Sequence, residues 1–400
     1  MREVVIAGYL RTAQSRSRPN KPEADCFYRF RSDELLAKLL PEVVGRAGIQ
    51  PSDVDDFVVG SALGVGEQWS FGGRTPLFLA DFPASVSAKF VDQQCGSSMA
   101  CVHVGFLEIA SGTADVVLLG GVEHMTRVPM GRLLGGGSEA VVWNRDLFEA
   151  PQYGHWDLKT ATNMGLTAEA LARQDGQSRE DQDHWALRAH QLAARAQAEG
   201  FFSGEILPIE TSGPDGAPVL IDRDQAVRPE TSLEGLAELR PAFLEGGVVT
   251  AGNASPLNAG ASAMVLMARE EAERRGVRPL AAVRSIGFAG VEPALMGTGP
   301  VPASRKALRQ AGLREADVDF WEINEAFCAV VLHCMKELGL DPERVNVKGG
   351  GTALGHALGA TGIRLVGTLA RILREKGARY GCATACCGGG QGVATVIEAI

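Results

Sequence analysis

The 400-residue sequence has no long hydrophobic run, and no stretch approaches the roughly 18 apolar residues of a membrane-spanning helix. It also lacks an excess of positive charge: 39 lysines and arginines stand against 48 acidic residues, a formal net charge of −9. A surface that binds nucleic acid needs a basic balance or a basic stripe, so we expect no nucleic-acid partner. A few local arginines could still bind an anionic coenzyme.

Cysteine pairs of the kinds that form disulfides or hold metals are missing as well. The eight cysteines form no C-x-x-C pair and lack the even spacing of a disulfide framework. We therefore expect reduced thiols and a cytoplasmic location. The chain starts without a signal-peptide core and ends in Glu-Ala-Ile, which is no peroxisomal signal. No G-x-G-x-x-G follows a strand and opens a helix, which argues against a nicotinamide cofactor.

The pattern that is present predicts an α/β protein. With 45% hydrophobic and 22% charged residues the chain can bury a large core, and its length predicts two or three packed units. Short β-branched runs alternate with longer amphipathic segments, which is typical of layered helices and strands. We expect strands at 4–7, 57–59, 116–119 and 394–397, and helices at 32–47, 178–200 and 303–311.

Two of these helices carry signals at their ends. Ser32 is the expected N-cap of the first, and Pro41 is expected to kink it. Ser178 and Asp181 have the spacing of a capping box, and Gly200 is placed to end that helix.

The sequence contains an internal repeat. Residues 47–55 (A-G-I-Q-P-S-D-V-D) are echoed 264 positions later by residues 311–319 (A-G-L-R-E-A-D-V-D). A second echo follows each copy: a glycine-rich turn, a small-residue helix and a strand that runs into glycines. Chance similarity between common turns is the alternative, but the matching order of elements favours duplication. Cys95 and His356 would then open equivalent helices in two related halves, with a site between them.

We therefore predict two duplicated, layered α/β halves with an inserted segment. The first half comprises residues 1–124 and 250–276, and the second comprises residues 277–400. Residues 125–249 contain glycine- and proline-rich loops, the long helix and a polar stretch. We interpret this segment as an inserted loop or lid domain.

Cys95 is the first candidate for chemistry. Apolar residues recur at helical spacing after the sequence V-D-Q-Q-C-G-S-S-M (91–99), which places Cys95 at a helix N-terminus. Unpaired N–H groups and the positive end of the helix dipole favour a thiolate there, and the thiolate is the nucleophilic form. The alternative is a buried structural cysteine.

Three further candidates lie in the last quarter of the chain. His356 stands in the glycine-rich turn 348–360, where it could take a proton from a thiol and bind an oxyanion, although such turns also bind phosphates. Cys386 precedes Cys387 and the glycines from Gly388 onward. A tuned cysteine could move a proton on a carbon beside a carbonyl, and glycine N–H groups could bind the oxyanion. A metal or a vicinal disulfide is the alternative for this pair. Asn324 follows an expected strand and could hold a water or simply cap a helix.

Taken together these segments resemble the thiolase family. Nine blocks appear in the family's order: C-G-S-S-M (95–99), G-G-V-E-H-M (120–125), M-G-L-T-A-E (164–169), L-R-P-A-F (239–243), T-A-G-N-A-S (250–255), G-P-V-P-A (299–303), N-E-A-F (324–327), the His356 cluster (348–360) and A-C-C-G-G-G-Q-G (385–392). They cover essentially the whole chain and are highly specific. The resemblance implies the thiolase fold, an αβαβα arrangement of two halves with an inserted loop domain.

The resemblance also implies roles for individual residues. Cys95 matches the acylated nucleophile, His356 its activating base, and Cys386 the acid/base group for the acetyl α-carbon. Asn324 matches the asparagine that holds a water in one oxyanion hole, and the Cys95 and Gly388 N–H groups match the other. The residues that match coenzyme A contacts are Ser255, Arg228, Met164, Leu239, Ala326 and Phe327.

The sequence departs from the family pattern at four positions. Ala357 replaces a proline after the histidine, Asp92 replaces an asparagine before the nucleophile, and Ala259 replaces an aspartate. Asn163 stands where acetoacetyl-specific members often have histidine. None of these changes removes a reacting group, but they weaken the case for acetoacetyl specificity.

The implied reaction is reversible thiolytic cleavage of a 3-ketoacyl-coenzyme A, and the Q-x-C-G-S-S-M and M-G-L-T-A-E forms favour the degradative type. Biosynthetic acetoacetyl-coenzyme A formation, a 3-ketoacyl synthase and a non-catalytic acyl-coenzyme A binding protein are the alternatives. Coenzyme A thioesters are substrates here, and no cofactor or metal is expected. The family forms dimers or tetramers, and some members dock onto an enoyl-coenzyme A hydratase/3-hydroxyacyl-coenzyme A dehydrogenase. The remaining histidines, His190 among them, are given no role.

Overall fold

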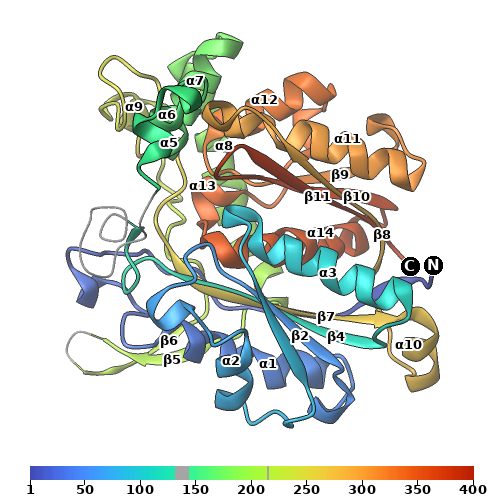
Figure 1. Cartoon of the computed structure of the whole chain (residues 1–400). Coiled ribbons are helices and arrows are strands. Elements are labelled where there is room, and N and C mark those ends of the chain that lie inside the picture. Colours follow the sequence, from blue (N-terminus) through green and yellow to red (C-terminus); the bar gives the residue numbers. More distant parts are fainter. Residues whose placement is uncertain (131–143, 214–215) are drawn as a thin grey trace.

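The computed structural model describes residues 1–130, 144–213 and 216–400. Within these residues nine strands form one sheet in the order β3-β2-β4-β7-β1-β8-β11-β10-β9 (Figure 1). They are β1 (Val4–Arg11), β2 (Asp56–Gly60), β3 (Ser87–Val91), β4 (Val116–His124), β7 (Ala259–Ala268), β8 (Ala281–Gly290), β9 (Phe320–Ile323), β10 (Tyr380–Cys387) and β11 (Gln391–Glu398). A separate pair is formed by β5 (Ile209–Ser212) and β6 (Pro218–Ile221). All four strands expected from the sequence are present.

Helices cover both faces of this sheet. The α-helices among the described residues are α1 (Ser32–Arg46), α2 (Arg74–Leu79), α3 (Ser97–Ser111), α5 (Asp146–Glu149), α6 (Leu158–Ala161), α7 (Met164–Asp175), α8 (Arg179–Ala198), α9 (Leu233–Ala237), α10 (Arg269–Arg275), α11 (Pro300–Ala311), α12 (Cys328–Leu338), α13 (Gly351–Leu354) and α14 (Thr361–Lys376). Figure 1 shows α3 and α14 between the two ends of the bent sheet, with α1 and α2 outside one end and α11 and α12 outside the other. The alternation helix, sheet, helix, sheet, helix confirms the layered fold expected from the sequence.

The sheet has an internal symmetry about the contact between β1 and β8. These strands pair antiparallel through three residue pairs, from Val4↔Val283 to Ile6↔Ala281. On one side the order is β1, β7, β4, β2, and on the other it is β8, β11, β10, β9. In each half the outer pair, β2 with β4 or β9 with β10, is parallel and the remaining pairs are antiparallel. The two halves therefore have the same topology, with β3 added at the edge of the first.

The repeated sequence forms the same local structure twice. Asp55 and Asp319, which end the two copies, each stand just before an outer strand. The carboxylate of Asp55 accepts a hydrogen bond of 3.0 Å from the N–H of Val116, where β4 begins. That of Asp319 accepts one of 2.9 Å from the N–H of Tyr380, where β10 begins. Equivalent aspartates thus join equivalent strands, which supports duplication over chance similarity.

The helix-end predictions have mixed outcomes. The Ser178–Asp181 capping box is confirmed at the start of α8, and Gly200 follows its end with a left-handed φ of 74°. The N-cap prediction for the first helix is wrong by one residue: Arg31 is the N-cap and Ser32 is already helical. The carboxylate of Glu34 accepts the Arg31 N–H at 2.9 Å, and the carboxylate of Asp33 accepts the Glu34 N–H at 3.0 Å, a donor that a serine N-cap would have satisfied. Pro41 lies inside α1, and the helix continues beyond this proline to Arg46.

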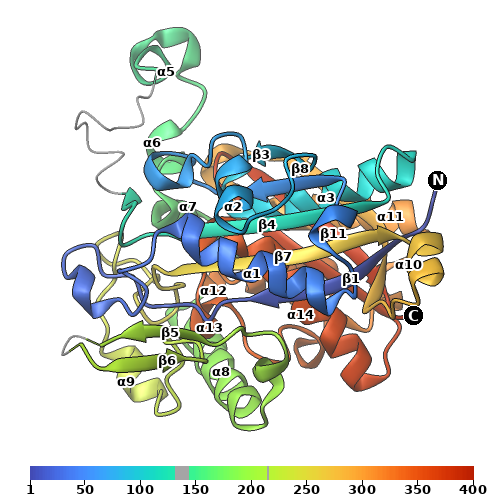
Figure 2. The same cartoon turned by 90° about the horizontal axis from the view of Figure 1, so that it is seen from below.

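The segment between β4 and β7 lies at one side of the layers formed by the sheet and its helices. In Figures 1 and 2 the short helices α5 and α6 project from that side, whereas α8 lies against the body of the molecule. Ala189 and Ala193 of α8 belong to the same buried cluster as α1, and Leu171 of α7 and Trp185 belong to the cluster around α12. This segment is therefore partly built into the core. Among the described residues no helix is long and apolar enough to cross a membrane.

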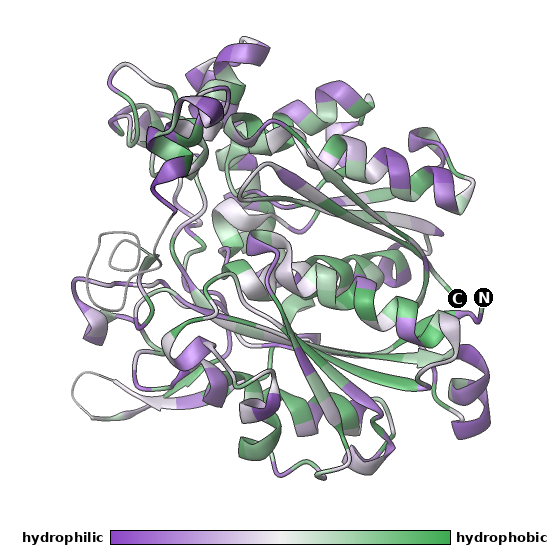
Figure 3. Ribbon diagram, viewed as in Figure 1, coloured by the Kyte–Doolittle hydropathy of each residue, from purple (hydrophilic) through white to green (hydrophobic). Residues whose placement is uncertain are grey.

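Hydrophobic residues concentrate in the strands and in the central helix α3 (Figure 3). The strands β4, β7 and β10 are buried along nearly their whole length, because helices cover both faces of the sheet. The central layer packs α3 against α14 and brings their N-terminal ends together. The fold thus places one helix start from each half at the middle of the molecule.

Candidate active site

The starts of α3 and α14 are in direct contact. Cys95 lies in a short 3-10 turn just before α3, and His356 lies just before the equivalent turn that precedes α14. The N–H of Ile363 in α14 donates to Oγ of Ser98 in α3 at 3.0 Å. A Cβ atom at Gly362 would lie 2.2 Å from the backbone of α3, so the close approach requires glycine. Two residues 261 positions apart are thereby brought to one place.

The backbone just before Cys95 has a strained conformation that hydrogen bonds from neighbouring side chains hold in place. Gln94, which precedes Cys95, has a left-handed φ of 51°. Such a conformation costs about 1 kcal/mol or more outside glycine. The carboxylate of Asp92 accepts the Gln94 N–H at 2.8 Å, and Oγ of Ser97 donates to the Gln94 carbonyl at 2.6 Å. Asp92, one of the departures from the family pattern, thus serves as an acceptor that fixes this turn.

Cys95 and His356 line the same cavity, which has a volume of about 360 Å³. Much of its wall is apolar, including Met125, Met130, Met164, Phe243, Met296 and Leu358. Of the residues expected to contact coenzyme A, Ser255, Met164, Ala326 and Phe327 line it. The reactive groups therefore border a largely hydrophobic chamber.

The start of α7 forms one wall of this chamber. Oδ1 of Asn163 accepts from the N–H of Gly165 at 3.1 Å and caps the helix. A Cβ atom at Gly165 would overlap the ring of Phe243, so glycine lets that ring lie flat against the helix. Phe243 in turn meets Phe327 edge to face, with ring centroids 5.9 Å apart. Asn163, another departure from the family pattern, has a structural role as this cap.

Hydrogen bonds determine which ring nitrogen of His356 carries the hydrogen. Its Nδ1 lies 2.7 Å from Oγ1 of Thr361, and that hydroxyl donates its own proton to the Ala357 carbonyl at 2.9 Å. Nδ1 must therefore carry a hydrogen and donate to Thr361. Nε2 is left as an acceptor, 3.2 Å from Nδ2 of Asn324. Burial, with a smaller effect of the nearby Arg364 charge, lowers the pKa of His356 to about 3, so the imidazole is neutral.

The loop that carries His356 is anchored by two polar side chains. The N–H of Ala357 donates to Oε1 of Gln14 at 3.0 Å, a bond that the family's usual proline could not make. The carboxylate of Glu123 accepts the N–H of Gly359 at 2.9 Å. Burial raises the pKa of Glu123 to about 7, opposed by this and other donors. Glu123 belongs to the sequence block G-G-V-E-H-M (120–125), but only the fold shows that it links β4 to the loop that carries His356.

The Cys95 thiol is less acidic than its position before a helix predicts. Burial raises its pKa to about 12, although a hydrogen bond from the Gly388 backbone acts in the opposite direction. The position at the helix start is confirmed, but desolvation outweighs the helix dipole and keeps the thiol protonated. A base must remove the proton when the thiol reacts. The neutral His356, with a lone pair on Nε2, has the required form.

Cys386 lies near Cys95 but does not line the cavity. It is fully buried near the end of β10. Burial raises its pKa well above the usual range, and the nearby Cys95 and Cys387 raise it further. Cys387 packs against Gly96, where a Cβ atom would lie 2.5 Å from its sulfur. All eight cysteines are free thiols. Three sulfur atoms are therefore gathered around the start of α3.

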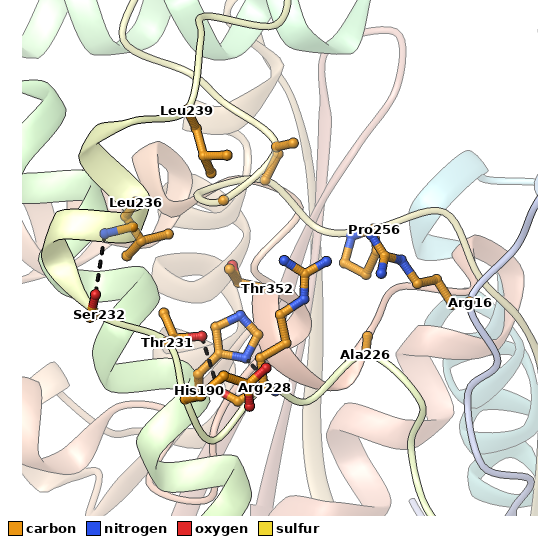
Figure 4. A pocket seen from close by; sticks show the side chains of 15 residues that line it. Arg16, His190, Ala226, Arg228, Thr231, Ser232, Leu236, Leu239, Pro256 and Thr352 are labelled. Atoms are coloured by element: carbon orange, nitrogen blue, oxygen red, sulfur yellow. Dashed lines mark hydrogen bonds between the residues drawn. The ribbon is translucent and has the colours of Figure 1, made fainter.

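A second cavity of about 240 Å³ adjoins the first, and Ala254 and Pro256 line both (Figure 4). The remaining expected contacts, Arg228 and Leu239, line this second cavity. Arg16 and His190 line it too, and sequence reasoning missed both of them. His190 accepts the Arg228 N–H on Nδ1 at 3.2 Å, and burial, then the Arg228 charge, lowers its pKa to about 4. The two cavities thus share part of their wall, with Cys95 and His356 lining the first and Arg16 and Arg228 lining the second.

Comparisons with known proteins agree with this architecture. A family model described as "Thiolase, N-terminal domain" matches residues 4–270, and one described as "Thiolase, C-terminal domain" matches residues 277–399. The chain belongs to the thiolase family and is thus an acyltransferase.

The relatives cover the full length of the chain. A 3-ketoacyl-CoA thiolase of Marinobacter nauticus is 42% identical over 100% of this chain and 99% of its own. One from Vibrio vulnificus is 42% identical over 100% of both. Among solved structures, the Bacillus anthracis acetyl-CoA acetyltransferase has a TM-score of 0.88 at 37% identity, and human mitochondrial 3-ketoacyl-CoA thiolase has 0.87 at 31%. Each match covers 100% of this chain and 99% of the other.

Proposed function

We propose that this enzyme cleaves 3-ketoacyl-coenzyme A with coenzyme A, giving acetyl-coenzyme A and a shortened acyl-coenzyme A, through an acyl group carried on Cys95. The observation that carries the proposal is the meeting of Cys95 and His356 at one cavity, with His356 neutral and its Nε2 unprotonated. A protonated thiol and a neutral imidazole at one cavity form a pair in which the imidazole can act as the base that activates the cysteine.

In the first half-reaction, Nε2 of His356 takes the Cys95 proton as the sulfur attacks the 3-keto carbon. The backbone N–H groups of Cys95 and Gly388 bind the oxygen that becomes negative, and Gly388 already donates toward the Cys95 sulfur. The bond between C2 and C3 then breaks. The acetyl-coenzyme A enolate leaves, with its thioester oxygen near His356 and Asn324, and Cys386 gives its proton to C2.

In the second half-reaction, coenzyme A replaces acetyl-coenzyme A in the cavities. The Cys386 thiolate takes the proton of the incoming coenzyme A thiol and is restored. The new thiolate attacks the acyl group on Cys95, and His356 returns its proton to the departing Cys95 sulfur. Every group ends in its starting state, and the same steps in reverse join two acyl groups.

The apolar wall supports a degradative enzyme over one restricted to acetoacetyl-coenzyme A. Four methionines line the cavity, and flexible methionine side chains adapt to unbranched chains of different length. The structural likeness to an acetyl-CoA acetyltransferase keeps the biosynthetic reaction as the second candidate. The two candidates share all chemical steps and differ in the acyl group.

The deciding experiment follows the loss of the magnesium–enolate absorbance with coenzyme A and a ladder of 3-ketoacyl-coenzyme A substrates, from acetoacetyl to 3-ketopalmitoyl. We expect kcat/KM to rise beyond acetoacetyl-coenzyme A. A maximum at acetoacetyl-coenzyme A would favour the biosynthetic enzyme. No cleavage of any member, by a protein that still binds coenzyme A, would refute catalysis and favour a binding protein.

We further propose that two copies associate through the edge strand β3. Among the described residues β3 pairs with β2 only, so its other edge is free to pair with another strand. Four large apolar side chains on the adjoining segment are exposed by half or more: Trp69, Phe71, Phe78 and Leu79. A two-fold axis would pair β3 with its own copy. Light scattering should give at least twice the chain mass of 42.2 kDa, and Trp69→Glu with Phe71→Glu should give monomers.

The division into residues 1–124 with 250–276, 125–249 and 277–400 remains our proposal for the domains. The matching topologies of the first and last of these parts support it. We also propose a cytoplasmic location, because eight free thiols, including the nucleophile, suit a reducing compartment. Limited proteolysis and fractionation of cells test these two points.

A further inference from the structure

The second cavity, of about 240 Å³, is lined by two guanidinium groups that point into the same space. Figure 4 shows the side chains of Arg16 and Arg228 reaching toward each other beside Pro256. They come from distant parts of the chain, since Arg16 follows β1 and Arg228 follows β6 by a few residues. We propose that Arg16 completes, with Arg228, a clamp for a phosphate group of coenzyme A. This inference rests on the proposed function and assigns Arg16 a binding role there.

Backbone hydrogen bonds hold Arg16 in position. The N–H of Ser15 donates to the carbonyl of Ala259 at 2.9 Å, and the N–H of Ser17 donates to that of Leu257 at 2.8 Å. The residue between them is thereby fixed beside the segment that borders both cavities. Arg16 is half-buried, so its guanidinium cannot swing freely into solvent. The arginine is therefore presented to the cavity by a rigid edge.

Neither arginine has an acidic partner. Across residues 1–130, 144–213 and 216–400, no ion pair or side-chain hydrogen bond of Arg16 or Arg228 occurs, although most arginines of this acidic chain have one. Burial lowers the pKa of Arg16, and the facing charge of Arg228 and that of Arg18 lower it further. Two like charges held together without a counter-ion repel each other. An anion between them would relieve this repulsion.

The chemistry of the cavity end fits a phosphate. Two planar guanidinium groups can each make two parallel hydrogen bonds to phosphate oxygens. His190 and Thr231 line the same cavity and add neutral polar groups. One acidic residue, Glu230, lines it as well, so the ligand must carry enough negative charge to be held by the two cations. Coenzyme A carries a 3′-phosphate monoester and a 5′-diphosphate, and either would satisfy both arginines.

The test compares Arg16→Gln with the matched control Arg18→Gln. Arg18 is two residues away, exposed and outside the cavity. Each variant is assayed with acetoacetyl-coenzyme A, acetoacetyl-dephospho-coenzyme A and acetoacetyl-pantetheine. We expect Arg16→Gln to raise KM for the coenzyme A thioester about tenfold, with kcat changed less than about twofold, because a lost charged hydrogen bond weakens binding by about that factor. KM for acetoacetyl-pantetheine should not change, and Arg18→Gln should resemble the wild type.

The three substrates locate the phosphate. If the effect of Arg16→Gln disappears with the dephospho substrate, the clamp binds the 3′-phosphate, and if it persists there the clamp binds the diphosphate. An equal effect on the pantetheine thioester, or none on the coenzyme A thioester, overturns the inference. Calorimetric titration with coenzyme A separates this result from the proposed function. A wild type that cleaves nothing but binds coenzyme A in an Arg16-dependent way would refute the reaction and keep the clamp.

Discussion

Nδ1 of His356 lies 2.7 Å from Oγ1 of Thr361, and the same hydroxyl lies 2.9 Å from the carbonyl oxygen of Ala357. The Thr361 hydroxyl has a fixed orientation, since it donates its hydrogen to the Ala357 carbonyl and accepts a hydrogen bond from the ring of His356. It thereby keeps Nε2 free of hydrogen, in the form that can accept a proton from a thiol.

Replacing the Thr361 hydroxyl should impair catalysis without removing any reacting group. We expect Thr361→Val to lower kcat about ten- to a hundredfold, because the imidazole loses the partner that selects its tautomer. KM should change little, since Thr361 is buried and lines neither cavity. Thr361→Ser keeps the hydroxyl and should restore most of the activity. Equal kcat values for the valine and wild-type enzymes would show that the hydroxyl does not control the histidine.

The two buried cysteines at the end of β10 should differ sharply in function. Cys386→Ala should still accept an acyl group on Cys95 but should not complete turnover, because no group remains to protonate C2 in cleavage or deprotonate it in condensation. Intact-mass measurement after incubation with an acyl-coenzyme A detects the added group. The neighbouring Cys387→Ala serves as control and should keep turnover. Full steady-state activity in Cys386→Ala would refute the assigned role.

Buried Glu322 should make stability depend on pH in an unusual direction. Burial raises its pKa to about 8, partly offset by the charge of Arg364, whereas an unfolded glutamate titrates near 4.3. A carboxyl with a raised folded pKa adds stability below the unfolded pKa and loses it as the pH rises through the folded pKa. Between about pH 4.5 and 8, Glu322→Gln should therefore gain stability relative to the wild type, by more than about 2 kcal/mol in total. Denaturant unfolding of both proteins at equal concentration measures the difference. A difference that stays constant over this range contradicts the prediction.

A buried ion cluster links the inserted segment to the first half. Arg11 of β1 pairs with Glu205 at 2.7 Å and with both carboxylate oxygens of Asp224 at 2.7 and 2.9 Å. Arg11→Met would leave buried carboxylates without their main cation and should destabilise the fold by about 3 kcal/mol or more. Arg274→Gln, which breaks an exposed pair with Glu271, should leave the melting temperature unchanged. Similar melting temperatures for both variants would contradict this.

Local signals in the sequence predicted much of this structure, because they depend on neighbouring residues. The Ser178–Asp181 box and Gly200 define α8 by interactions within a few positions. Ser32 failed as a cap because the helix begins one residue earlier, and the Glu34 N–H that a serine cap would have satisfied donates to the carboxylate of Asp33.

The repeat was also visible in the sequence and placed Cys95 and His356 at one site. Properties that depend on distant packing were not visible. The helix position of Cys95 suggested a thiolate, but burial, which only the assembled fold defines, raises its pKa instead. Arg16 was missed for the same reason, since it reaches the cavity only because Ser15 and Ser17 pair with a segment 240 to 244 residues away.

The pairing of β1 with β8 has an evolutionary consequence. Two identical half-length chains related by a two-fold axis would have to carry the same side chain at both helix starts, so that a thiol would face a thiol or an imidazole an imidazole. Joining both copies in one polypeptide lifts that restriction and lets position 95 and position 356 specialise independently. Separate residues for nucleophile and base are thus open to the fused molecule and closed to a dimer of identical halves.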